Sequence, residues 1–239
     1  DRTTGSTSID MYDYKTLSKV KTIASSRTMD AIQYFSNYIF SEDERKAILE
    51  TNTEPIYRHS VLGHYYVFDI NSNRLEMISE DKIQEPTFSP DGTKVAYGHT
   101  NNLFIKDLLS GTTKQITFDG EKNKIINGIT DWVYEEEFAF VRAFEWNAGS
   151  DTIAFIRFDE TEVPEFSMDI YGTDLYQTQE VFKYPKAGEK NAIVSLHFYD
   201  LNADQISTVA LSKNYQDFYI PRIKWTKDST ILSAQYLNR

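Results

Sequence analysis

The sequence predicts an all-β protein, a partial β-propeller of about four blades with one short helical insertion. Two interleaved repeats carry this prediction. In the first, an aromatic residue precedes a short polar turn and a run of β-forming residues; in the second, a short strand ends in Asp and a turn, and another strand follows. Together they describe a four-stranded antiparallel meander. Repeated meanders of this length are typical of propeller blades.

The first repeat occurs four times, and its aromatic residues are Phe40, Phe88, Trp146 and Trp225. The turn after Phe88, Ser-Pro-Asp-Gly, has the residue types that favour tight turns. The last copy ends after its second strand at Arg239, which predicts an incomplete final blade. This favours a fragment of a propeller, although a complete four- or five-bladed ring also lies within the known propeller sizes.

The second repeat places Asp13, Asp69, Asp107 and Asp200 at the ends of short strands. Asp side chains favour such turns because they accept hydrogen bonds from backbone groups that follow them. Each of these positions is therefore expected to begin the turn of an outer hairpin.

The spacing between copies of the first repeat grows along the chain, which predicts insertions into particular blades. One insertion carries two β-type runs around Asp169 to Tyr184. These runs predict an extended hairpin arm. A long decorated loop is the alternative, since edge hairpins commonly carry aromatic residues.

Another insertion carries residues 131–137, Asp-Trp-Val-Tyr-Glu-Glu-Glu, in which three carboxylates directly follow two large aromatic residues. Asp131 is a favourable N-cap, and acidic residues stabilise the first turn of a helix. We therefore expect a short helical turn, in which two neighbouring side chains can converge on one ligand. Burial beside aromatic rings raises carboxyl pKa values unless a cation or hydrogen-bond donors compensate, so a cationic ligand is expected. A solvated surface turn is the alternative.

Composition excludes several functions. The 36 Asp and Glu residues outnumber the 25 Lys and Arg residues, and the formal charge of -11 opposes binding to nucleic acid or anionic lipid. No apolar run is long enough for a membrane span. The absence of cysteine excludes thiolate catalysis and Cys-type zinc sites. No Gly-x-Ser-x-Gly elbow, metal-binding His pattern or phosphate loop occurs, so no catalytic residue, cofactor or metal is expected in this chain.

Residues 127–137, Asn-Gly-Ile-Thr-Asp-Trp-Val-Tyr-Glu-Glu-Glu, closely resemble the signature of the dipeptidyl peptidase IV family of serine exopeptidases, within the prolyl oligopeptidase superfamily. Three more stretches match the family in the same order. They are residues 57–60 (Tyr-Arg-His-Ser), 159–164 (Asp-Glu-Thr-Glu-Val-Pro) and 184–188 (Tyr-Pro-Lys-Ala-Gly). The resemblance extends from about residue 30 to residue 239, and four matches in register are far more specific than one.

The resemblance implies a substrate-binding role. In the family, the second and third acids of the Glu triplet, here Glu136 and Glu137, hold the free amino terminus of a peptide substrate. The Arg of the upstream motif, here Arg58, binds the carbonyl of the first substrate residue. Tyr57 replaces the family's Trp before this Arg, and residues 138–140 (Phe-Ala-Phe) replace Val-Phe-Ser, which leaves the side-chain preference of the pocket open.

The resemblance also implies how the chain fits into a larger protein. The family has an eight-bladed propeller and a C-terminal α/β-hydrolase domain with a Ser-Asp-His triad. Residues 1–239 are therefore expected to be the N-terminal portion of the propeller, about half of the ring, with the hydrolase domain outside this chain. The arm from Asp169 to Tyr184 implies a homodimer, and the family implies an exported protein. The lack of cysteine departs from mammalian members and suggests a bacterial relative.

The implied activity is release of X-Pro or X-Ala dipeptides from peptide amino termini. An ammonium anchor at a fixed distance from a serine acts as a ruler, because each extended residue spans at most about 3.5 Å. Two alternatives remain. A tripeptidyl peptidase of the same superfamily would have this anchor about one residue further away. A non-catalytic propeller would only bind partners.

Overall fold

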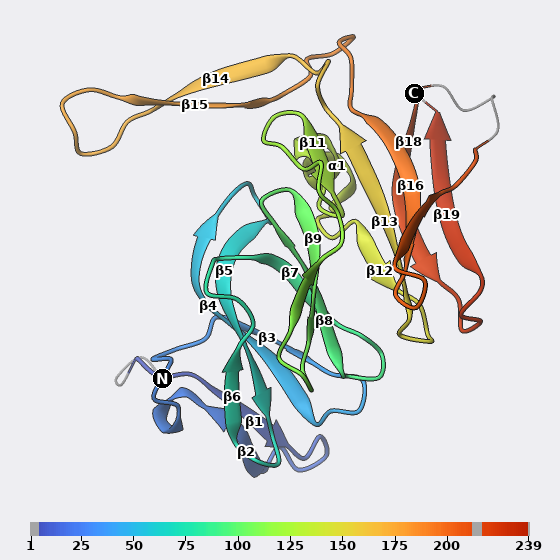
Figure 1. Cartoon of the computed structure of the whole chain (residues 1–239). Helices are drawn as coiled ribbons and strands as arrows, with labels where there is room; N and C mark the ends of the chain where they lie inside the picture. Colours follow the sequence, from blue (N-terminus) through green and yellow to red (C-terminus); the bar gives the residue numbers. More distant parts are fainter. Residues whose placement is uncertain (1–4, 212–216, 239) are drawn as a thin grey trace.

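Antiparallel β-sheets dominate the structure, a computed structural model that describes residues 5–211 and 217–238 (Figure 1). Two sheets have the four strands of the predicted meander, in chain order. The first contains β3 (Asn37–Phe40), β4 (Lys46–Pro55), β5 (Val61–Asp69) and β6 (Arg74–Met77). The second contains β7 (Gln84–Phe88), β8 (Lys94–His99), β9 (Asn102–Asp107) and β10 (Thr113–Gln115). The predicted all-β, partial-propeller fold is confirmed.

A third sheet is larger because it also receives strands from an insertion. Its order is β11-β13-β16-β17, and β12 also pairs with β13. These strands are β11 (Ile125–Asn127), β12 (Phe144–Trp146), β13 (Thr152–Asp159), β16 (Ile193–Asp200) and β17 (Gln205–Thr208). The segment between β11 and β12 contains the helical insertion.

Two-stranded sheets lie at both ends of the described chain. At the N-terminal end, β1 (Ser8–Tyr12) pairs with β2 (Lys19–Ser25), and a 3-10 turn (Ser26–Thr28) follows. At the C-terminal end, β18 (Phe218–Trp225) pairs with β19 (Leu232–Asn238). This last pair contains the two strands that the fourth aromatic repeat predicts.

The Asp residues of the second repeat make the turns of the outer hairpins. Asp13, Asp69, Asp107 and Asp200 each accept, through Oδ1, the backbone N–H groups two and three residues later, at 2.7–3.1 Å. This bonding satisfies two turn donors without tertiary contacts. The local nature of the bonding explains why the pattern is visible in the sequence.

The tryptophans of the first repeat connect neighbouring sheets. Trp146 donates from Nε1 to the carbonyl oxygen of Thr87 on β7, at 3.2 Å. Trp225 donates in the same way to the carbonyl oxygen of Glu145 on β12, at 3.0 Å. An indole inside the fold needs a partner for its N–H, so each of these two tryptophans joins its own sheet to a strand of the preceding one.

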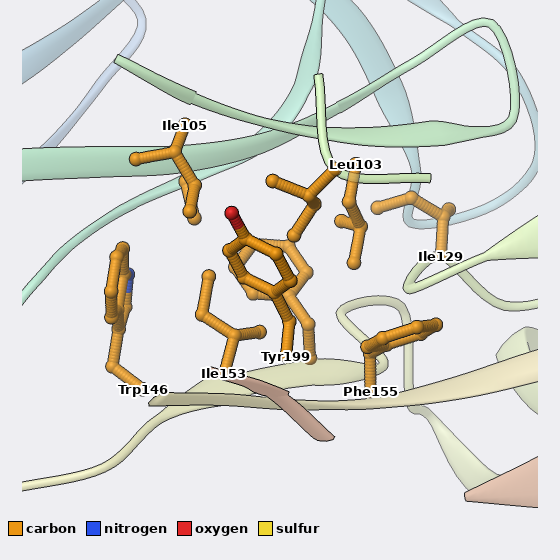
Figure 2. Packing of buried hydrophobic residues seen from close by; sticks show 10 residues of the cluster. Leu103, Ile105, Ile129, Trp146, Ile153, Phe155 and Tyr199 are labelled. Carbon is orange, nitrogen blue, oxygen red and sulfur yellow. The ribbon is translucent and has the colours of Figure 1, made fainter. Parts of the chain in front are cut away.

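The core between the second and third sheets is apolar and closely packed. Leu103 and Ile105 from β9 face Ile153 and Phe155 from β13, and Tyr199 of β16 lies between them (Figure 2). These side chains are at most 6% exposed. The two sheets therefore pack face to face, and Ile129, from the insertion between β11 and β12, belongs to the same core.

A hairpin projects from the body of the molecule, as predicted for the insertion around Asp169 to Tyr184 (Figure 1). Its strands are β14 (Glu165–Ile170) and β15 (Thr178–Lys183), which pair only with each other. Its tip exposes large apolar side chains, such as Leu175 at 90%. Among the described residues, no helix is long and apolar enough to cross a membrane.

Candidate functional site

Helix α1 (Trp132–Phe138) carries the Glu triplet, and it begins after Asp131, as the sequence predicts. Asp131 is the N-cap, and its Oδ1 accepts the Tyr134 N–H at 3.0 Å. The helix ends at Ala139, which has a left-handed conformation with φ of 48°. Tyr134 is buried, and its hydroxyl accepts the N–H of Ile220 on β18 at 2.8 Å. The helix is therefore fixed at its start and against a neighbouring sheet.

Glu135, the first acid of the triplet, is 1% exposed and binds backbone rather than ligand. Its Oε1 accepts the N–H of His59 at 2.6 Å and the N–H of Ser60 at 2.8 Å. These two donors lie in the loop between β4 and β5, directly after Arg58. Charge-assisted hydrogen bonds of this kind are about twice as strong as neutral ones. Glu135 thus joins the helix to the Arg58 loop.

Glu136 and Arg58 form an ion pair beside this junction. Arg58 Nε donates to Glu136 Oε2 at 2.9 Å. The Glu136 side chain is 17% exposed and the Arg58 side chain 71%. In the described part of the chain, the terminal nitrogens of this guanidinium have no hydrogen-bond partner. They remain available to a ligand in the adjoining cavity.

Both side chains line a cavity of 920 Å³, and the exposed side chain of Glu137 lines it too. The opposite wall is the base of the arm, including Phe182 and Tyr184. Tilted ring pairs close the wall: Tyr57 lies 6.0 Å from Phe182, and Trp132 lies 4.4 Å from Tyr184, between ring centroids. Glu180 and Lys186 complete the charged lining, so the cavity has three carboxylates, one guanidinium, one ammonium and aromatic walls. This arrangement suits a ligand with an ammonium group and a carbonyl.

Comparison with known proteins identifies the family. The family profile described as "Dipeptidyl peptidase IV (DPP IV) N-terminal region" matches residues 41–239. The chain belongs to the dipeptidyl peptidase IV family. The family resemblance inferred from the four motifs is thereby confirmed.

Two curated relatives and one solved structure illustrate the similarity to this family. Prolyl endopeptidase FAP of Homo sapiens is 32% identical over 229 residues, covering 91% of this chain and 30% of the relative. Dipeptidyl peptidase 4 of Sus scrofa is 32% identical over 230 residues, covering 89% and 29%. The crystal structure of Porphyromonas gingivalis dipeptidyl peptidase 4 superimposes with a TM-score of 0.92 and 40% identity, covering 97% of this chain and 33% of that one. The chain thus spans about a third of the length of these relatives.

The structure brings together the three residues that the family resemblance selects. Arg58, Glu136 and Glu137 line one cavity, although Arg58 is 78 positions from Glu136 in the chain. Their contacts differ, because Glu136 is paired with Arg58, whereas the side chain of Glu137 has no ion pair or hydrogen bond with any described residue. Their roles toward a substrate stay predictions.

Sequence reasoning missed Glu135 and the base of the arm. One signal for Glu135 was available: it lies four positions after the N-cap Asp131 and next to Tyr134, which places it on the inward face of the helix. No local signal indicated that Phe182 and Tyr184 face the Glu helix, because hairpin side chains at alternate positions have equal access to either face.

Two buried carboxyls lie behind the helix. Asp131 and Glu160 are each 6% exposed. Burial raises the pKa of Asp131 to about 6. Burial, together with the nearby charge of Asp131, raises the pKa of Glu160 to about 7, and Lys183 opposes this shift. The described residues contain no group of three or more His, Cys, Asp or Glu side chains that could hold a metal ion.

The substitution Asp131→Asn should reduce the pH dependence of stability. The folded-state pKa of about 6 lies above the unfolded value near 4, so the folded chain binds more protons between these pH values. The stabilisation from this group is complete below about pH 4 and is lost as the pH rises through about 6. Urea unfolding between pH 4 and pH 7.5 measures how the free energy of unfolding changes with pH. The amide oxygen of the introduced Asn can still accept the Tyr134 N–H, so the cap is retained.

The matched control is Asp174→Asn, in the exposed part of the arm. This substitution should leave the pH dependence of the free energy of unfolding unchanged. Glu160 still contributes to the pH dependence of stability up to about pH 7. The pH dependence of the free energy of unfolding should therefore be smaller in Asp131→Asn than in the parent chain, but it should not vanish. An unaltered pH dependence in Asp131→Asn would contradict the assignment of this buried acid.

Proposed function

We propose that this chain forms the part of a serine dipeptidyl peptidase that recognises the amino terminus of a peptide substrate. The observation that carries the proposal is the Arg58–Glu136 pair, at 2.9 Å, on a cavity that Glu137 also lines. Membership of the dipeptidyl peptidase IV family supports it.

The chemistry of the cavity matches this substrate. A peptide α-amino group has a pKa near 8, so it is mostly protonated at neutral pH. Glu136 and Glu137 supply the opposite charge, and the pair energy at 4 Å rises from about 1 kcal/mol in water to about 4 kcal/mol at an effective dielectric constant of 20. The terminal nitrogens of Arg58 donate to the carbonyl oxygen of the first substrate residue, while Nε remains on Glu136.

The intact protein, in this proposal, completes an eight-bladed ring and adds an α/β-hydrolase domain with the catalytic triad. It releases X-Pro or X-Ala dipeptides, is exported, and forms a homodimer through the arm. The relatives named dipeptidyl peptidase 4 support dipeptide release, and the name prolyl endopeptidase supports proline selectivity. The apolar tip of the arm, with Tyr171 and Tyr176 each 79% exposed, supports an interface.

The intact protein should release nitroaniline from Gly-Pro-nitroanilide and should leave acetyl-Gly-Pro-nitroanilide nearly untouched. Acetylation removes the ammonium charge that Glu136 and Glu137 bind. Steady-state kinetics on both substrates and on Ala-Ala-Pro-nitroanilide tests the proposal. Release of tripeptides alone would assign a tripeptidyl peptidase, and no hydrolysis of any substrate would assign a non-catalytic propeller.

A further inference from the structure

A second cavity, of 540 Å³, lies beside the candidate substrate cavity. Thr130 and Glu160 line it but do not line the first cavity. Tyr57 and Phe182 line both cavities, as Ile56 and Glu180 do, so their paired rings, 6.0 Å apart, form part of the wall between them. Its volume is within the range of small-molecule sites, roughly 300–1,000 Å³.

Two buried polar groups at this second cavity have no hydrogen-bond partner in the described part of the chain. Thr130 is 6% exposed, and its Oγ1 is without a partner. Glu160 is equally buried, and its carboxylate accepts no hydrogen bond. The neighbouring buried acids Asp131 and Glu135 both accept backbone N–H groups. A buried hydroxyl without a partner costs about 1–3 kcal/mol, so Thr130 has an unmet hydrogen bond at this cavity, and the Glu160 carboxylate on the same cavity can accept further donors.

Glu160 has no ion pair with a described residue, and neither has Glu180, which lines the same cavity. Asp131 and Asp159 are the negative groups that act on Glu160, and Lys183 is the positive one. The ammonium of Lys183 donates to the carbonyl oxygen of Val163 at 2.8 Å and lies 3.6 Å from a carboxylate oxygen of Glu165. The cavity is also lined by the acids Glu121 and Glu180 and by Lys82 and Lys122, and Lys82 is paired with Glu54 at 2.6 Å. Because Lys183 and Lys82 are held by other oxygens, a further cation at Glu160 would meet more negative than positive charge.

We propose that the cavity lined by Thr130 and Glu160 binds a small primary ammonium compound. An ammonium group has three N–H donors, which match the carboxylate oxygens of Glu160 and the hydroxyl oxygen of Thr130. The ring of Tyr57 lines the same cavity, and aromatic faces attract organic cations. A metal ion fits less well, because the described side chains bring together no group of three potential ligands.

The site is separate from the proposed substrate anchor, yet it adjoins it. Tyr57 directly precedes Arg58, and the Tyr57 N–H donates to Ser60 Oγ at 3.3 Å. A compound in the second cavity that contacts Tyr57 therefore touches the same loop that carries Arg58. The assignment does not depend on the proposed peptidase activity, because binding is measured without substrate.

Isothermal titration of the full chain with n-butylammonium chloride at pH 8 tests the proposal. We expect saturable binding with a Kd in the millimolar range, at least tenfold weaker in Glu160→Gln and in Thr130→Val. Lowering the pH to 6 should also weaken it, since Glu160 is then mostly protonated. Circular dichroism confirms that each variant is folded, and the two independent variants keep the test valid if one is not. Glu162→Gln is the control, because Glu162 is exposed and paired with Lys190 at 3.1 Å.

A second comparison distinguishes this cavity from the substrate anchor, which also attracts ammonium groups. In the double variant Glu136→Gln, Glu137→Gln, binding should persist with an unchanged Kd. Loss of binding in that variant, with retention in Glu160→Gln, would place the amine in the substrate cavity and overturn the proposal. Equal binding of potassium chloride at the same ionic strength, or no saturable binding at all, would also overturn it.

Discussion

Replacing Glu136 by Gln in the intact protein is expected to lower kcat/KM for Gly-Pro-nitroanilide by about 10²–10³-fold. The substitution keeps the shape of the side chain but removes the charge that faces the substrate ammonium. One charge pair at 4 Å in a partly dry cavity is worth about 4 kcal/mol, and each 1.4 kcal/mol corresponds to tenfold. It also weakens the hold on Arg58, since Nε then donates to a neutral amide oxygen.

The corresponding change at Glu137 should have a smaller effect. Glu137 is exposed, whereas the Glu136 side chain is only 17% exposed, so water and salt screen the charge of Glu137 more strongly. Steady-state kinetics at 20 mM and 500 mM NaCl distinguishes the two variants, because the decrease in kcat/KM caused by Glu137→Gln should be smaller at high salt. Glu162→Gln is the control and should retain normal kinetics. A near-normal kcat/KM in Glu136→Gln would contradict the proposal that Glu136 binds the amino terminus of the substrate.

The fold was predictable because its signals are local. Asp107 and Asp200 make their turns with N–H groups two and three residues away, so the hairpins are encoded within a few positions. The first repeat is less local, since Trp146 and Trp225 bond to the preceding sheet. Its recurrence, although unequally spaced, still indicated repeated blades. The helix was predictable for the same reason, through its N-cap Asp131.

The site was predictable only in part, because its geometry joins distant segments. Family resemblance selected Arg58 and Glu136, but no pattern in the chain indicated how they meet across 78 positions. The arm base was equally hidden, since Tyr57 and Trp132 face Phe182 and Tyr184 only after the sheets have assembled. Contacts of this kind depend on tertiary packing.

Glu135 explains how the two distant segments are held at a fixed separation. It has no exposed surface to offer a ligand, and both of its backbone partners belong to the loop that follows Arg58. Because the loop and the helix are joined by a buried acceptor, the guanidinium of Arg58 reaches Glu136 without needing a strong surface ion pair. The exposed pair alone would contribute at most about 1 kcal/mol.

Glu135→Ala should therefore destabilise the chain by about 3–5 kcal/mol, since it leaves the N–H groups of His59 and Ser60 without an acceptor, each at a cost of about 1–3 kcal/mol, and opens a small void. Glu135→Gln keeps the acceptor oxygen and should cost clearly less. Urea unfolding of the three proteins measures these differences. Glu137→Ala, which removes an exposed acid of the same helix, is the control and should fall within about 0.5 kcal/mol of the parent chain.

In the intact protein, Glu135→Gln is the informative variant, because it stays folded while its hold on the loop is weaker. If Glu135 acts by placing Arg58, then KM should rise more than kcat falls, since Arg58 binds substrate and does not take part in bond cleavage. Adding Arg58→Ala to this variant should then raise KM by a smaller factor than Arg58→Ala does in the parent protein, because the two changes remove one shared interaction. Full additivity would show that Glu135 stabilises the fold without positioning Arg58.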